Sequence, residues 1–274
     1  MIYENMMGRR TNFRYSDLSS VFKSAKLADY IKRIFSKGDE VIPTIINKKK
    51  PILHLLTHNL LPYSEVIFRA LNNKVKFVEI IRHPLYMIIQ QTLNQQHFYN
   101  NKDKSRQFHL CFEKNNNEFF FWNHEYIEEF ENCSPIERAV IEIEYFFKKA
   151  NDFKLNNKQF SKNIYTVVFE QFVLNPYPCL ESLINFIGTK KSKYTKKILK
   201  NSRIPRNKLS EEIPLDIYKR CGWEPPKKNF NEKEELNHRR NFILKNNARK
   251  KYIEVIDKLS YEYENNYMKE ILEI

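Results

Sequence analysis

Short apolar runs alternate with amphipathic stretches along most of the chain. Three of the apolar runs predict buried strands, at residues 51–57 (PILHLLT), 75–82 (VKFVEIIR) and 164–170 (IYTVVFE). Apolar residues at helical spacing predict helices over residues 17–35, 62–71, 84–99, 135–151 and 176–187, and a long helix from about 232 nearly to the C-terminus. This alternation is typical of α/β proteins, in which helices wrap a parallel sheet. No internal repeat or long linker interrupts it, so we predict one domain over residues 1–274.

Three further segments add detail to this layout. Residues 108–122 (FHLCFEKNNNEFFFW) place aromatic-rich runs on both sides of an Asn-rich turn, which predicts a β-hairpin insertion. Residues 134–137 (SPIE) form a capping box with proline at the first helical position, and this predicts where the next helix begins. Residues 189–230 are basic and contain prolines, and we expect them to be irregular.

The composition excludes several classes of protein. Hydrophobic residues make up 42% of the 274 positions, so the chain can build a core and is not a disordered chain. No apolar run approaches the roughly 20 residues that a membrane span needs. The N-terminal stretch MIYENMMGRRTNF lacks the apolar segment of a signal peptide. The four cysteines lie far apart without a CxxC pair, which argues against a disulfide framework or a cysteine zinc site and favours a cytoplasmic location.

The chain carries a large positive charge. Lys and Arg number 47 against 33 Asp and Glu, a formal net charge of +14. A basic surface favours an anionic partner, such as a nucleic acid, an acidic glycan, a membrane surface or a phosphorylated cofactor. The same surplus also fits the coding bias of an AT-rich genome, because the chain is rich in Lys, Asn, Ile and Tyr and has only 4 Gly.

Arg82 ends the strand predicted over residues 75–82, and Pro84 begins the next helix. A guanidinium beside a helix N-terminus suits a phosphate, because it adds a fixed positive charge to free backbone N–H groups and to the helix dipole. Gln90, about two turns into that helix, could add an amide donor. Ligands of parallel sheets bind beyond the carboxyl ends of the strands, so we expect the site here.

His58 stands in the equivalent place, just after the strand predicted over residues 51–57. The pKa of a histidine is near neutrality, so this side chain can act as a general base. A lone histidine is more often structural, but His58 and Arg82 follow two successive strands. We therefore expect both side chains to open onto one crevice, at the carboxyl ends of neighbouring parallel strands.

Three segments resemble PAPS-dependent sulfotransferases, and they occur in the family's order: LLTHNLLP (55–62), ALNNKVKFVEIIRHP (70–84) and VVFEQFVLNPYPCLESLINFIG (167–188). Together they cover most of residues 50–190. The resemblance implies a P-loop NTPase-like sulfotransferase fold. It also implies transfer of a sulfuryl group from PAPS to an acceptor hydroxyl, with no metal required. The family suggests a carbohydrate as one candidate acceptor.

The resemblance assigns roles to residues of the first two segments. His58 matches the family's catalytic base, and Arg82 matches the arginine that holds the 3′-phosphate of the cofactor. Gln90 stands in the place of a serine that assists this arginine. Leu56 replaces a lysine that precedes the histidine in the family, so one positive charge is missing from the crevice.

Three more residues are implied to bind the cofactor. Phe169 stands where the family often has a tyrosine near the adenine. Arg203 and Arg206 lie in the basic loop KNSRIPRN (200–207), at the place of the family's late cofactor loop. Both arginines are therefore candidates for the same 3′-phosphate, although the glycines that are usual in that loop are missing.

The largest departure from the family is at the start of the chain. The family has a phosphate-binding loop well before the histidine motif, and here residues 7–12 (MGRRTN) are the candidate, with no apolar strand before them. We therefore expect a fold that is N-terminally incomplete. Activity should be impaired, because the loop's N–H groups and basic side chain would stabilise charge on the leaving phosphate.

Two other classes of function stay open. A basic, non-catalytic module for RNA or an acidic polymer would use the lysine tracts at residues 189–200 and 245–251. Over the rest of the chain acidic residues interleave with the lysines, and no RNA-binding motif is present, so we expect no specific nucleic-acid partner. A nucleotide kinase relative is disfavoured, because the chain has no GxxxxGK(S/T) motif.

Overall fold

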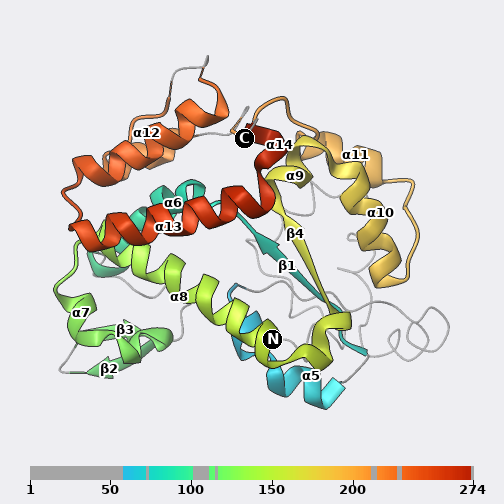
Figure 1. Ribbon diagram of the computed structural model, residues 1–274, viewed down its shortest axis with the longest axis horizontal. Helices are drawn as coiled ribbons and strands as arrows, with labels where there is room; N and C mark the ends of the chain where they lie inside the picture. Colours follow the sequence, from blue (N-terminus) through green and yellow to red (C-terminus); the bar gives the residue numbers. More distant parts are fainter. Residues whose placement is uncertain are drawn as a thin grey trace, which may run out of the picture. The chain divides into compact units, whose positions relative to one another are not determined.

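The structure is a computed structural model, and it describes residues 58–71, 74–100, 111–114, 117–210, 215–226 and 230–272 (Figure 1). The chain divides into two compact units. The smaller comprises residues 1–58 and 191–202, and the larger comprises residues 59–190 and 203–274. The predicted helix 17–35 and strand 51–57 lie outside the described residues. The prediction of a single domain stays a prediction.

Two parallel strands form a small sheet in the larger unit. β1 (Phe77–Ile81) pairs with β4 (Ile164–Val168), so that Phe77 lies opposite Ile164 and Ile81 lies opposite Val168 (Figure 1). The parallel pairing of these two apolar runs confirms that part of the sequence prediction. The predicted strand 164–170 is two residues too long, because Phe169 already begins helix α9 (Phe169–Leu174).

Helices contact both faces of this sheet. On one face, Phe77 and Ile164 pack against a buried cluster that includes Phe68 of α5 (Glu65–Leu71) and Phe153 of α8 (Pro135–Asn156). On the other face, the ring centre of Tyr165 lies 5.4 Å from that of Phe186 in α10 (Pro176–Ile187). Side chains alternate between the two faces of a strand, so one small sheet supports both layers.

The main core lies between helices. α6 (Pro84–Asn100) packs against α8, and α13 (Lys250–Tyr267) packs against both of them (Figure 1). α12 (Glu232–Lys245) lies on α6. The chain is therefore mostly helical with a small sheet of parallel strands, an arrangement compatible with the predicted α/β class.

Short elements connect these layers. The remaining described elements are η3 (Leu61–Tyr63), β2 (Cys111–Lys114), β3 (Asn117–Phe120), η5 (Phe121–Glu125), α7 (Ile127–Glu131), η6 (Lys158–Asn163), α11 (Thr195–Asn201), η7 (Asp216–Cys221) and α14 (Lys269–Leu272). β2 and β3 pair in antiparallel fashion, which confirms the predicted hairpin. The capping box is confirmed too, because Ser134 and Glu137 each accept a backbone N–H of the other. The segment 189–230 was predicted to be irregular, but it contains α11 and η7.

The predicted long C-terminal helix is wrong in one respect. The structure has three helices there, α12, α13 and α14, in place of one. Asn247 ends the first of them with a φ of 53°, and Arg249 takes an extended conformation before α13. Asparagine tolerates the left-handed region better than most residues do, so the chain can turn here without glycine or proline.

Candidate functional site

The candidate site lies where the two parallel strands end. Arg82 follows β1 and Phe169 follows β4, so both residues stand at the same edge of the sheet. The guanidinium carbon of Arg82 lies 4.6 Å from the ring centre of Phe169 and 5.5 Å from that of Tyr86. These distances are those of cation–π contacts.

The guanidinium of Arg82 is charged and incompletely satisfied. Burial lowers its pKa, and the nearby Glu170 carboxylate raises it in part. An arginine keeps its charge under such conditions, because its ordinary pKa is far above neutrality. The Nε atom of Arg82 is buried, and within the described part of the chain it has no hydrogen-bond partner. A buried donor of this kind lowers the stability of the fold unless a ligand or a water molecule accepts a hydrogen bond from it.

Arg206 reaches the same ring from the loop that follows α11. Its guanidinium carbon lies 6.0 Å from the ring centre of Phe169. The loop is held in place, because the backbone N–H of Arg206 donates to the carbonyl of Val173 (2.8 Å) and its Nη1 donates to that of Leu209 (2.9 Å). Arg203 is exposed, with a φ of 55°, and its carbonyl accepts from Nε of Arg206 (3.4 Å). The structure thus brings Arg82, Phe169 and Arg206 together.

A third arginine, Arg239 of α12, was not predicted from the sequence. It is 2% exposed, and its Nε and Nη2 donate to Oε1 of Glu235 at 3.0 and 2.6 Å. Its guanidinium carbon lies 4.5 Å from the ring centre of Tyr86 and 4.8 Å from that of Trp223. It was missed because it stands in a run of charged residues that is typical of a solvated helix. We call Arg82, Arg206, Arg239, Tyr86 and Phe169 the strand-end cluster.

The N–H groups at the start of α6 are not free, contrary to the expectation. Nδ1 of His83 accepts from the N–H of Leu85 (3.1 Å). The carbonyl of His83 accepts from Tyr86 (2.9 Å) and Met87 (3.3 Å). Pro84 has no N–H. The helix is capped by its own preceding residue, so a phosphate bound here would depend on side chains rather than on backbone donors.

A fixed negative charge also lies at this edge of the sheet. Glu170 is 1% exposed, and its carboxylate accepts from the backbone N–H of His83 (3.0 Å) and from the hydroxyl of Tyr263 (2.6 Å). Burial and the Glu170 carboxylate raise the pKa of Tyr263, which keeps its hydroxyl a donor. The Glu170 carboxylate therefore offsets part of the positive charge of Arg82, although the two side chains do not form a direct ion pair.

The amide of Gln90 is engaged elsewhere. Its Nε2 donates to Oδ1 of Asn94 (2.9 Å), and its Oε1 accepts from the hydroxyl of Tyr218 (2.8 Å). The expectation that Gln90 is a donor for a phosphate is therefore not supported by the geometry. Gln90 instead joins α6 to η7.

His58 lies in the smaller unit, and its side chain is exposed. Arg82 belongs to the larger unit. The predicted crevice shared by His58 and Arg82 therefore stays a prediction. The candidate phosphate-binding loop at residues 7–12 lies outside the described residues.

Comparisons with protein-family models, with curated proteins and with solved structures give no match to this chain. Within the described part of the chain, no helix is long and apolar enough to cross a membrane. The same residues contain no group of three or more His, Cys, Asp and Glu side chains that could hold a metal ion. The site is therefore interpreted from its own geometry.

Proposed function

We propose that the chain is a sulfotransferase-like protein that holds the 3′-phosphate of PAPS at the strand-end cluster and serves sulfuryl transfer to an acceptor hydroxyl. One observation carries this proposal. Arg82 follows a parallel strand, lies against Phe169 and keeps a buried Nε without a partner. A phosphate oxygen is an acceptor of the kind that this donor lacks.

The cluster fits a phosphate in part. Arg82 and Arg206 both contact the Phe169 ring and supply positive charge there. Arg239 is committed to Glu235 and adds only to the local potential. The start of α6 adds no free donors. We infer a site that binds a phosphate group mainly by arginine side chains and that is weaker than one with a backbone cradle.

The remaining step of the proposal concerns His58. PAPS, when bound, supplies the sulfuryl group. An exposed imidazole can take the proton of an acceptor hydroxyl, which is the role that the family resemblance gives to His58. A carbohydrate is our candidate for the acceptor.

The decisive experiment is calorimetric titration of the full chain with adenosine 3′,5′-bisphosphate. Arg82→Ala should weaken binding about tenfold to a hundredfold, since a hydrogen bond to a charged group contributes about 1.5–3 kcal/mol. Arg69→Ala is the matched control, because Arg69 is an exposed arginine that pairs with Glu65 (2.6 Å) on α5. Equal affinity of the wild-type chain and Arg82→Ala would refute the assignment. Loss of binding in Arg69→Ala as well would show that the effect is one of overall charge.

A second experiment addresses the chemistry. His58→Ala should abolish sulfuryl transfer to a test acceptor and leave nucleotide affinity unchanged, because a base acts on the acceptor and not on the cofactor's phosphate. Transfer that persists in His58→Ala would remove this residue from the mechanism.

A polyanion-binding function is the second candidate. The lysines of the stretch 191–200 are exposed in the smaller unit, namely Lys191, Lys193, Lys196, Lys197 and Lys200. No acidic residue interrupts them. RNA affinity that falls steeply with salt, together with no binding of adenosine 3′,5′-bisphosphate, would favour this function over the first.

A further inference from the structure

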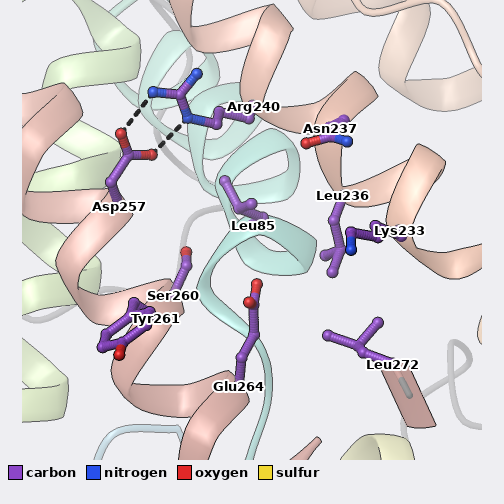
Figure 2. Close-up of a pocket in the computed structure, with 10 residues that line it drawn as sticks. All are labelled: Leu85, Lys233, Leu236, Asn237, Arg240, Asp257, Ser260, Tyr261, Glu264 and Leu272. Carbon is purple, nitrogen blue, oxygen red and sulfur yellow. Dashed lines mark hydrogen bonds and ion pairs between the residues drawn. The ribbon is translucent and has the colours of Figure 1, made fainter. Parts of the chain in front are cut away.

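A separate pocket of 190 Å³ lies among α6, α12, α13 and α14 (Figure 2). No residue of the strand-end cluster lines it. Its walls combine apolar, polar and charged side chains, among them Leu85, Leu236, Lys233, Ser260 and Glu264. The volume is smaller than the roughly 300–1,000 Å³ of sites for drug-sized ligands. A ligand of this pocket is therefore a small metabolite.

Glu264 brings a negative charge into the pocket, and among the residues that the structure describes no cationic side chain neutralises it. Its Oε1 lies 3.1 Å from Nε2 of His83, which is fully buried. Nδ1 of His83 accepts the N–H of Leu85, so this nitrogen carries no proton and the imidazole is neutral. Nε2 is then the protonated nitrogen and donates to Glu264. The carboxylate gains a hydrogen bond but no countercharge, and its side chain is 25% exposed.

Two further charged residues of this pocket, Arg240 and Asp257, neutralise each other. Nε and Nη2 of Arg240 donate to the two carboxylate oxygens of Asp257 at 2.7 and 2.6 Å. This bidentate pair closes one side of the pocket and leaves little net charge there (Figure 2).

Lys233 supplies the complementary positive charge. It stands on α12 and lines the same pocket as Glu264, and Figure 2 shows its ammonium beside the Leu236 side chain. Among the residues that the structure describes, no carboxylate forms an ion pair with it. The pocket thus presents one unneutralised carboxylate and one unpaired ammonium, facing a common space.

The inner wall of the pocket is apolar. Leu85 and Leu236 are 4% and 5% exposed and form this wall. Ser260 adds one polar atom, because its hydroxyl donates to the carbonyl of Ile256 (2.7 Å) and its oxygen can still accept.

We propose that this pocket binds a zwitterionic α-amino acid with an apolar side chain. Its ammonium would contact Glu264 and the oxygen of Ser260, and its carboxylate would contact Lys233. Its side chain would lie against Leu85 and Leu236, where it displaces water from apolar surface. A ligand with both charges satisfies both pocket residues, whereas an amine or a carboxylic acid alone leaves one of them unmatched.

The test is a calorimetric titration of the full chain with L-leucine in the absence of nucleotide, so that its outcome is independent of the proposed sulfuryl transfer. Two analogues accompany it: 3-methylbutylamine, which lacks the carboxylate, and 4-methylpentanoate, which lacks the ammonium. We expect saturable binding of leucine and at least fivefold weaker binding of each analogue.

Two variants locate the site. Glu264→Gln should weaken leucine binding on the order of tenfold, and it keeps an oxygen that can accept from His83, so the fold is preserved. Lys233→Ala should weaken binding about threefold, because an exposed charge is screened by water. Glu262→Gln and Lys258→Ala are the matched controls, since both side chains are exposed on α13 and neither lines the pocket.

Three results would overturn the proposal. The first is the absence of saturable binding of leucine. The second is leucine binding that neither Glu264→Gln nor Lys233→Ala weakens. The third is binding of the amine that equals that of leucine and is insensitive to Lys233→Ala, which would make the pocket an amine site.

Discussion

Glu137 at the start of α8 and Arg249 just before α13 form a charged contact that supports a stability prediction. Oε1 of Glu137 accepts from the backbone N–H (2.9 Å) and Nε (2.8 Å) of Arg249. Oε2 accepts from Nη2 of Arg249 (3.1 Å) and from the backbone N–H of Ser134 (2.9 Å). One carboxylate thus caps α8 and fixes the start of α13. The perturbation is Glu137→Gln, which removes the charge at nearly constant shape.

The size of the effect follows from the pKa. Burial alone raises the pKa of the Glu137 carboxyl, but the hydrogen bonds from Arg249 and Ser134 outweigh it and lower the pKa from 4.5 to about 2. Each pKa unit corresponds to about 1.4 kcal/mol, so the lowered pKa corresponds to about 3 kcal/mol. The Arg249 side chain is 48% exposed, and water screens part of its interaction. We therefore expect Glu137→Gln to lower the free energy of unfolding by about 2 kcal/mol at pH 7.

The pH dependence checks the mechanism. The pKa is lower in the folded state, so the stabilisation is complete above the unfolded-state pKa of 4.5 and is lost as the pH falls towards 2. Urea denaturation of the wild-type chain and Glu137→Gln should show a gap at pH 7 that narrows towards pH 3. Glu144→Gln, an exposed change on the same helix, should show no gap. A gap for Glu137→Gln that is independent of pH would refute the electrostatic reasoning.

Three further predictions concern stability. Burial raises the pKa of Glu142 to about 7, so ionisation of this carboxyl lowers the stability of the folded state. The free energy of unfolding of the wild-type chain, measured by urea denaturation, should therefore fall between pH 5 and pH 8, and Glu142→Gln should remove that fall. Phe68 is fully buried, and its ring centre lies 4.9 Å from that of Phe160. Phe68→Ala should therefore lower the free energy of unfolding, measured by thermal denaturation, by about 3–5 kcal/mol, and a decrease below about 1 kcal/mol would contradict this packing. Gly188 ends α10 with a φ of 75°, so Gly188→Ala should cost about 1 kcal/mol by chemical denaturation, although a Cβ there meets no atom within 4 Å.

The periodic elements of the larger unit were predictable from the sequence. α6 begins at Pro84 and α10 ends before Gly188, as the helix signals predict. The two apolar runs that become β1 and β4 pair in parallel because the helices between and after them cover both faces of the sheet. The break between α12 and α13 was not predictable in the same way. It depends on Asn247 in a left-handed conformation and on the docking of Arg249 against α8.

From the residue pattern alone, the candidate site was predictable only at Arg82, which comes directly after an apolar run. Phe169 and Arg206 were named because the family resemblance implied them. Arg239 and Trp223 come from far along the chain, and no local pattern connects them to β1. Gln90 illustrates the same limit, because its hydrogen-bond partner Tyr218 lies 128 residues away. Side-chain pairing over such separations depends on tertiary packing, which periodicity does not report.

His83 is the residue that most changes the interpretation of the strand-end cluster. A strand followed by an arginine and a helix N-terminus predicts a phosphate site built on free backbone donors. Here His83 uses its Nδ1 and its carbonyl to satisfy those donors, and its own N–H is taken by Glu170. The helix therefore needs no anion to complete its first turn. Among the described residues, Nε of Arg82 is a buried donor without a partner at this edge, so we expect an anion there to be recognised by a guanidinium rather than by the helix.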